Sequence, residues 1–471
     1  MAVAITDTTA TSTPALQLLE WPEGIAYRTP ESMPNDDLED ETPRANDARS
    51  TPTRAQQRRT RMTRDAFIKS ITRPNGYLDP ANSRIILTAS FVDKYFPKDG
   101  SVFQGYEFLN RSAPSSPVLG HLLDMCYCLY AGVYNDDKRL LRASKILYQK
   151  GLQSLQVELK RPKANRGHLI GAIHMLQSAE IYSVLGLDEF SWRRHIPGLV
   201  YAVKANPSER LEPQVQTLLS GTIRLFALWE GLLSRKTMGT CDALWPQIFD
   251  VKIWGSSAGL NDIAMKVPGV LQDTDTIVRY GKAASRDVVT FCMKTIITIE
   301  GDLHGFMHML CKKLPGQAYW ITGRIPFLQL IECPKDSSCP SLGYSFPNLG
   351  VAHMHTTYWM CLLALRQAQL DIRKSMTKAQ YPFPLTKAIR DKMTNDAGEC
   401  AMSLIMTIPY MLEFARLASG YMALACSLAP LQMAYLWYKQ QKDLVLMTHC
   451  QRIGRYIESL GIRCSWADEI V

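Results

Sequence analysis

The stretch Val215–Leu233, VQTLLSGTIRLFALWEGLL, carries the clearest structural signal in this sequence. Its large apolar side chains recur at helical intervals and are Val215, Leu218, Leu219, Leu225, Phe226, Trp229, Leu232 and Leu233. That spacing places them on one side of a repeat of 3.6 residues. Such a stripe needs a covering surface, so the segment predicts an amphipathic helix packed against other helices.

The same helical period continues on both sides of this stretch. One face before it is formed by Leu122, Met125, Cys126 and Leu129, and a second stripe by Leu141, Tyr148, Leu152, Leu155 and Leu159. Asn135 is predicted to cap the second of these helices, with Asp136 and Asp137 in its first turn. Further helices are expected near 274–313, 351–374, 397–416, 421–438 and 441–460. Strand patterns are confined to 84–92 and 251–254, so the predicted fold class is all-α.

The composition separates an N-terminal arm from a helical region. The chain has 471 residues, of which 46% are hydrophobic, enough to bury a sizeable core. Residues 1–80 are rich in Thr, Ser, Pro and charge without periodicity, which predicts a disordered arm before a helical regulatory domain at 81–471. The arm carries an acidic block around Leu38 and then a basic block, whose members are Arg54, Arg58, Arg59, Arg61 and Arg64.

The basic block is a candidate nuclear-import signal or phosphate-contacting arm. A solvated charged linker explains the same composition and stays open. Arginines alone give a salt-sensitive attraction that is blind to sequence, because base readout needs an ordered element in a groove. Direct DNA contact is therefore left open by the sequence.

The cysteines and the apolar segments indicate an intracellular protein without a membrane span. All twelve cysteines lie between Cys126 and Cys464, mostly alone in apolar runs, as expected in a reducing compartment. The start of the chain has no features of a secretory signal. Leu417–Tyr438 is uncharged and long enough to cross a bilayer. Pro430 would break a helix there, and a buried core helix is the favoured interpretation.

One sequence motif is compatible with hydrolase chemistry. Residues 255–259, GSSAG, match the G-x-S-x-G turn that exposes a nucleophilic serine, here Ser257, and His449 is a late histidine that could serve as base. The rest of the chain supplies too few strands for a hydrolase sheet and no Gly-rich oxyanion motif. A polar loop between helices is the favoured interpretation, and no catalytic residue is assigned.

The histidines and cysteines do not form a recognisable metal site. His304 and His308 lie four residues apart on a predicted helix, but Cys311 is about 10 Å along the axis from His304. His353 and His355 would point to different faces of a helix. No C-x-x-C occurs, and Cys333 and Cys339 stand in a loop without a second pair. No metal or cofactor is therefore predicted.

Several segments together resemble the helical regulatory region of fungal-specific transcription factors of the six-cysteine zinc-cluster class. The first series is Tyr148–Leu155, then His168–Glu180 (HLIGAIHMLQSAE), then Trp192–Gly198 (WRRHIPG). Phe346–Trp359 resembles a later family segment, and 401–438 resembles the terminal paired helices. The match covers roughly residues 85–465. Trp192, His195 and Gly198 are interpreted as a packing corner, in which Trp192 seals a helix pair and Gly198 permits close approach.

The resemblance implies a nuclear regulator of transcription, with control of a secondary-metabolite gene cluster as one expectation. The family's zinc cluster needs a C-x-x-C start near the N-terminus, and this sequence has no cysteine before Cys126. Either an upstream segment carries that module, or the chain acts through the transcription machinery or another DNA-binding regulator. A homodimer is open. The alternatives are a helical binding or scaffold protein outside transcription and a serine hydrolase using Ser257.

Overall fold

The computed structural model describes most of the helical region. The described residues are Thr88, Phe91 and the ranges 101–161, 164–185, 191–204, 211–218, 223–237, 257–322, 342–376, 386–418 and 421–468. All of them belong to the unit Ile85–Val471. The acidic and basic blocks of the arm lie outside the described residues, as do Cys333 and Cys339.

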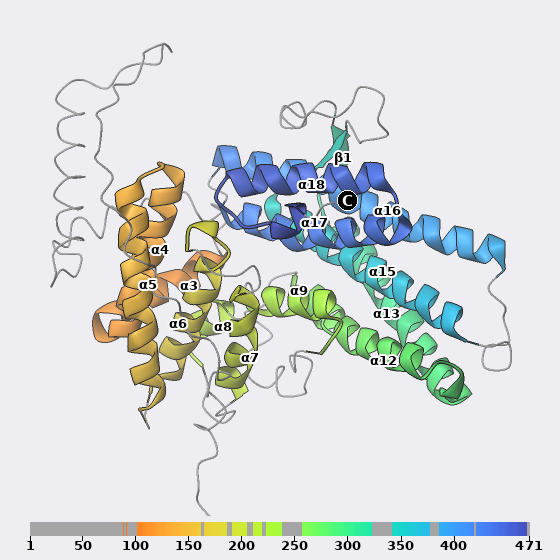
Figure 1. Cartoon of the computed structure of the whole chain (residues 1–471), viewed down its shortest axis with the longest axis horizontal. Coiled ribbons are helices and arrows are strands. Elements are labelled where there is room, and N and C mark those ends of the chain that lie inside the picture. The colour runs from red at the N-terminus through yellow and green to blue at the C-terminus, as the bar shows by residue number, and fades with distance from the viewer. Residues whose placement is uncertain are drawn as a thin grey trace, which may run out of the picture. The chain divides into compact units, whose positions relative to one another are not determined.

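The first part of this unit is a set of short and medium helices. They are α3 (Ser101–Ser112), α4 (Pro117–Tyr134), α5 (Lys138–Leu159), α6 (Arg166–Ala179), α7 (Ser191–Lys204), α8 (Pro213–Leu218) and α9 (Arg224–Ser234). Helix α4 packs along α5 and also contacts α6, while α6 contacts α7 and α3 contacts α8. Helix α9 contacts α7 and also two helices from later in the chain, α12 (Val267–Tyr280) and α17 (Tyr421–Gln441) (Figure 1).

The second part consists mainly of longer helices. They are α11 (Ser257–Ala264), α12 (Val267–Tyr280), α13 (Arg286–Lys313), α15 (Leu349–Ser375), α16 (Lys387–Ala418), α17 (Tyr421–Gln441) and α18 (Leu444–Ser459). Consecutive members from α15 to α18 pack against each other, and α15 also contacts α12 and α13. The described strands, β1 (Trp320–Thr322) and β2 (Gly343–Ser345), pair antiparallel with Ile321 opposite Tyr344. The fold is all-α, as the sequence predicted.

Side-chain caps mark where several helices begin. Asp137, Asn165, Ser285, Asn348 and Asp443 each accept a hydrogen bond from a backbone N–H in the first turn of the following helix. These bonds satisfy amide groups that have no partner inside the helix. The predicted cap Asn135 is wrong by two residues: Asn135 is the C-cap of α4, and Asp137 is the N-cap of α5.

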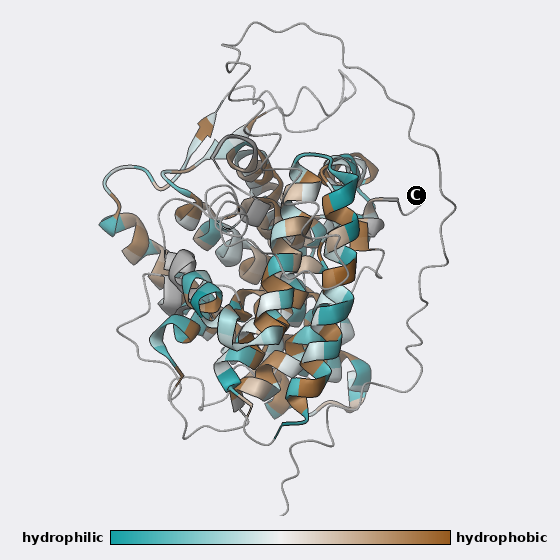
Figure 2. Ribbon diagram, turned by 90° about the vertical axis from the view of Figure 1, so that its left-hand side faces the viewer, coloured by the Kyte–Doolittle hydropathy of each residue, from teal (hydrophilic) through white to brown (hydrophobic). Residues whose placement is uncertain are grey.

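A continuous hydrophobic core joins the described helices. It includes Leu122 of α4, Met175 of α6, Trp229 of α9, Ile296 of α13 and Tyr435 of α17, all at most 2% exposed. Many helices show hydrophobic and hydrophilic residues on different sides in Figure 2. Burial of these stripes stabilises the fold at about 25 cal/mol per Å² of apolar surface, so tertiary packing accounts for helices whose own propensity is modest.

Two sequence expectations about helices need correction. The stretch 215–233 is not one of them: α8 ends at Leu218 and α9 begins at Arg224, but residues 219–222 lie outside the described part, so a single helix there stays a prediction. The predicted helix 274–313 is two helices, because α12 ends at Tyr280 before a turn through Gly281. Pro430 does not end its helix: α17 continues through it to Gln441. No described helix is long and apolar enough to cross a membrane.

Candidate functional site

The three segments that carry the first part of the family resemblance meet at the carboxylate of Glu180. Its Oε1 accepts a hydrogen bond from the Tyr148 hydroxyl at 2.6 Å and lies 2.7 Å from His195 Nε2. Tyr148 belongs to α5, Glu180 follows the last residue of α6, and His195 belongs to α7. One oxygen atom therefore connects three helices. We call Tyr148, Glu180 and His195 the Glu180 clamp.

Burial decides how the clamp can act. Tyr148, Glu180 and His195 are 7%, 5% and 6% exposed. A carboxylate taken out of water destabilises a protein unless hydrogen bonds replace its hydration, and here a hydroxyl and an imidazole do so. No surface of the carboxylate is left for a substrate. The clamp is suited to fixing the relative positions of α5, α6 and α7, and we assign it no catalytic role.

Next to the clamp, aromatic and charged contacts attach α7 to α9. The Trp192 ring lies 5.6 Å from the Phe226 ring, and Phe226 lies 5.1 Å from Trp229. Arg193 donates to both carboxylate oxygens of Glu230, with Nη2 2.9 Å from Oε1. Trp192 is partly buried and packs against the core. It covers the junction of α7 with α9.

Gly198 does not have the role that the sequence suggested. A Cβ atom built at this position would meet no other atom within 4 Å, so the glycine does not permit a close helix approach. Gly171 of α6 does, because its Cβ would lie 2.2 Å from Leu109 Cδ2. The packing corner thus consists of Trp192 and His195, and the close contact lies one helix earlier.

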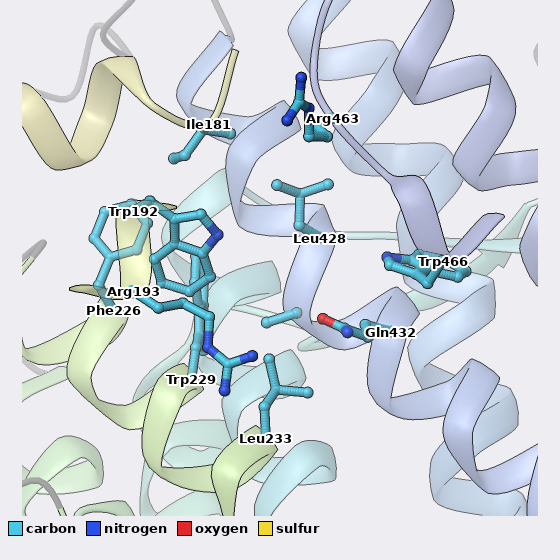
Figure 3. A pocket seen from close by; sticks show the side chains of 11 residues that line it. Ile181, Trp192, Arg193, Phe226, Trp229, Leu233, Leu428, Gln432, Arg463 and Trp466 are labelled. Carbon is cyan, nitrogen blue, oxygen red and sulfur yellow. The ribbon is translucent and has the colours of Figure 1, made fainter. Parts of the chain in front are cut away.

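A small pocket opens beside Trp192. Figure 3 shows Trp192, Phe226 and Trp229 on one side of it and Leu428, Gln432 and Trp466 on the other. Its volume is about 30 Å³, and a space of that size holds about two water molecules. The pocket is too small for an organic substrate.

Ser257 and His449, the residues considered for hydrolase chemistry, belong to two different helices, α11 and α18. Ser257 is the first residue of α11, and the residues before it, 251–256, lie outside the described part. His449 is fully buried in α18, where burial lowers its pKa to about 4. Within the described ranges the only sheet is the β1–β2 pair. An α/β-hydrolase site needs a larger sheet to present its serine.

Two of the histidines considered as metal ligands, His304 and His355, have hydrogen-bond partners, and a third, His353, contacts an aromatic ring. His304 Nδ1 lies 2.7 Å from the Tyr358 hydroxyl, and His355 Nδ1 lies 2.9 Å from the carbonyl of Val351. Burial lowers the pKa of His353 to about 4, and its ring lies 6.4 Å from that of Trp229. No group of three metal-ligating side chains comes together among the described residues.

The described cysteines are mostly core residues. Cys126 and Cys128 are buried in α4, and burial raises the pKa of the Cys126 thiol to about 12. Cys400 is also buried, with its pKa raised to about 11, although Arg366 Nη1 lies 3.1 Å from its sulfur. Such thiols are protonated at neutral pH and are poor nucleophiles.

Comparison with known proteins adds no relative. No family model, no curated protein and no solved structure matches this chain. The family resemblance therefore depends on the residues themselves. The sequence contained the members of the Glu180 clamp but no signal that their atoms meet.

Proposed function

We propose that this chain is a transcriptional regulator of the fungal type, acting in the nucleus through partner proteins or a separate DNA-binding module. The observation that carries the proposal is the Glu180 clamp. Tyr148, Glu180 and His195 come from three separate segments of the resemblance and are joined at one buried oxygen. Polar residues that are buried and bonded to one another in this way hold helices together, which is a structural role that suits a regulatory helical domain.

The chemistry of the described residues favours binding over catalysis. The Glu180 carboxylate is almost fully buried, the pocket beside Trp192 has room for about two water molecules, and His304 and His355 have hydrogen-bond partners within the fold. A helical unit of this kind suits contacts with other proteins or with an effector. The basic block around Arg58 would bring the chain to the nucleus.

The test is localisation of the tagged full chain, followed by chromatin pull-down. Arg58, Arg59, Arg61 and Arg64 are changed together to Ala. A matched control removes the same charge from exposed positions of the folded unit, namely Arg142, Lys145, Lys387 and Arg390. We expect the wild type and the control to be nuclear and enriched at particular promoters, and the arm variant to remain in the cytosol.

The outcomes separate the alternatives. A cytosolic wild type without promoter enrichment would refute the regulatory proposal and favour a helical scaffold protein. Hydrolysis of model esters by the wild type, lost on Ser257→Ala, would favour the hydrolase. Equal loss of nuclear signal in the control variant would show that overall charge, and not the basic block, determines import.

A further inference from the structure

A cavity is lined by residues of α9, α15 and α17. Its volume is about 200 Å³. The apolar side chains that line it come from all three helices and are Leu232, Leu233, Leu363, Ala364, Met433, Leu436 and Trp437. Leu436 is 44% exposed, so the cavity is reached from solvent on that side. This space is separate from the water-sized pocket beside Trp192, although Leu233 borders both.

One lining residue supplies a hydrogen-bond acceptor without a partner. Gln367 is 9% exposed, and its Nε2 donates to Asp371 Oδ1 at 2.7 Å. The amide cannot be turned over, since its oxygen would then face the carboxylate. Gln367 Oε1 is therefore left as the acceptor, and it is buried with no hydrogen-bond partner among the described residues. A buried acceptor of this kind destabilises the empty protein, so a ligand that donates to it gains affinity.

The charges around this acceptor disfavour anions. Arg235, which also lines the cavity, has Nε 2.8 Å from Asp275 Oδ1 and Nη2 3.8 Å from Asp371 Oδ2. The guanidinium is thus already engaged by two carboxylates. A carboxylate or phosphate ligand would have to compete with them for Arg235, whereas a neutral hydroxyl can donate to Gln367 without that competition.

We propose that this cavity binds a small neutral aromatic compound with one hydroxyl group, of the phenol class. The size argues for a single ring, because a dry apolar cavity of about 150 Å³ already holds benzene. Trp437 and Met433 provide the polarisable wall that suits a ring. The proposal concerns binding alone and does not depend on the transcriptional role.

The experiment is a ligand-detected NMR titration of the full chain with phenol, toluene and benzoate. Phenol and toluene share the ring, and only phenol donates a hydrogen bond. We expect saturable binding of both, about fivefold tighter for phenol, since one net hydrogen bond changes affinity by roughly that factor. Benzoate should bind more weakly than toluene.

Variants locate the site. Gln367→Leu removes the acceptor and should abolish the preference for phenol while toluene still binds. Ala364→Met fills the cavity and should displace both compounds. Gln432→Leu is the matched control, because Gln432 borders the pocket beside Trp192 and not this cavity, and it should bind like wild type. Far-UV circular dichroism confirms that each variant is folded.

Three results would overturn the proposal: no saturable binding of phenol or toluene to the wild type, binding by folded Ala364→Met equal to wild type, or an unchanged phenol preference in Gln367→Leu. None of these readouts depends on localisation or promoter binding. Failure here and failure of the proposed function are therefore distinguishable.

Discussion

Removal of the Glu180 carboxylate should destabilise the protein strongly. In Glu180→Ala, the Tyr148 hydroxyl and His195 Nε2 both lose the acceptor that lies 2.6 and 2.7 Å away. Each is at most 7% exposed, so water does not easily replace the carboxylate. Loss of a hydrogen bond to a charged group costs about 1.5–3 kcal/mol, which gives about 4 kcal/mol for the two together.

Thermal unfolding followed by circular dichroism measures this effect. Unfolding entropy is about 2.1 cal/mol/K per residue, or about 0.8 kcal/mol/K for a unit of this length, so a loss of about 4 kcal/mol lowers the Tm by about 5 °C. Glu158→Ala is the control: Glu158 pairs with exposed Arg161 at the end of α5. Loss of such a surface pair costs about 0–1 kcal/mol and should lower the Tm by about 1 °C at most.

The effect of Tyr148→Phe in two backgrounds tests whether Tyr148 stabilises the protein through Glu180. In the wild type, Tyr148→Phe removes one hydrogen bond and should cost about 1 kcal/mol. In the Glu180→Ala background this hydrogen bond is already absent, so the same change should cost clearly less than in the wild type. If Tyr148→Phe destabilises both backgrounds equally, or Glu180→Ala has no larger effect than Glu158→Ala, the carboxylate does not hold the three helices.

Three further predictions concern acid stability, glycine packing and thiol access. Burial lowers the pKa of His174 to about 4, below its ordinary 6.5, so the unfolded state takes up the proton first. Stability should therefore be lost as pH falls from about 6.5 to about 4, and the Tm of His174→Asn should fall less over that range. Gly198→Ala should raise the Tm by about 1 °C through helix propensity, whereas Gly171→Ala, which collides with Leu109, should lower it. Among the nine described cysteines only Cys311 is exposed, so mass spectrometry after brief alkylation of the native chain should find it modified before the other eight.

The sequence predicted local structure well because helical periodicity is a local property. The stripes through Leu122 and Tyr148 form α4 and α5, and both residues are buried as expected. The spacing of apolar residues within a few turns is enough to indicate which side of a helix faces the core. The same periodicity predicts helices at the positions of α15 to α18.

Boundaries were harder because tertiary packing can override local preference. Pro430 disfavours a helix, yet α17 continues through it and buries its own neighbouring side chains Leu431 and Ala434 completely. The missed strands β1 and β2 have three residues each, and Ile321 finds its partner Tyr344 only through the fold. A three-residue strand leaves no measurable alternation in a sequence.

The site features were beyond sequence reasoning for a related reason. Tyr148, Glu180 and His195 were all visible as members of a familiar series, but their convergence on one oxygen depends on how three helices cross. The α9–α15–α17 cavity draws on residues as distant as Leu232 and Trp437. No periodic signal connects such positions.

Any sequence specificity at promoters has to come from outside the basic block. Arginines such as Arg58 and Arg59 attract phosphates through counterion release, which depends steeply on salt and hardly on base sequence. Purified chain that binds unrelated duplexes alike, with affinity lost between low and moderate salt, would place promoter choice in a partner protein. The folded helices would then contribute the contact surface for that partner, and the Glu180 clamp would contribute the rigidity that a specific surface requires.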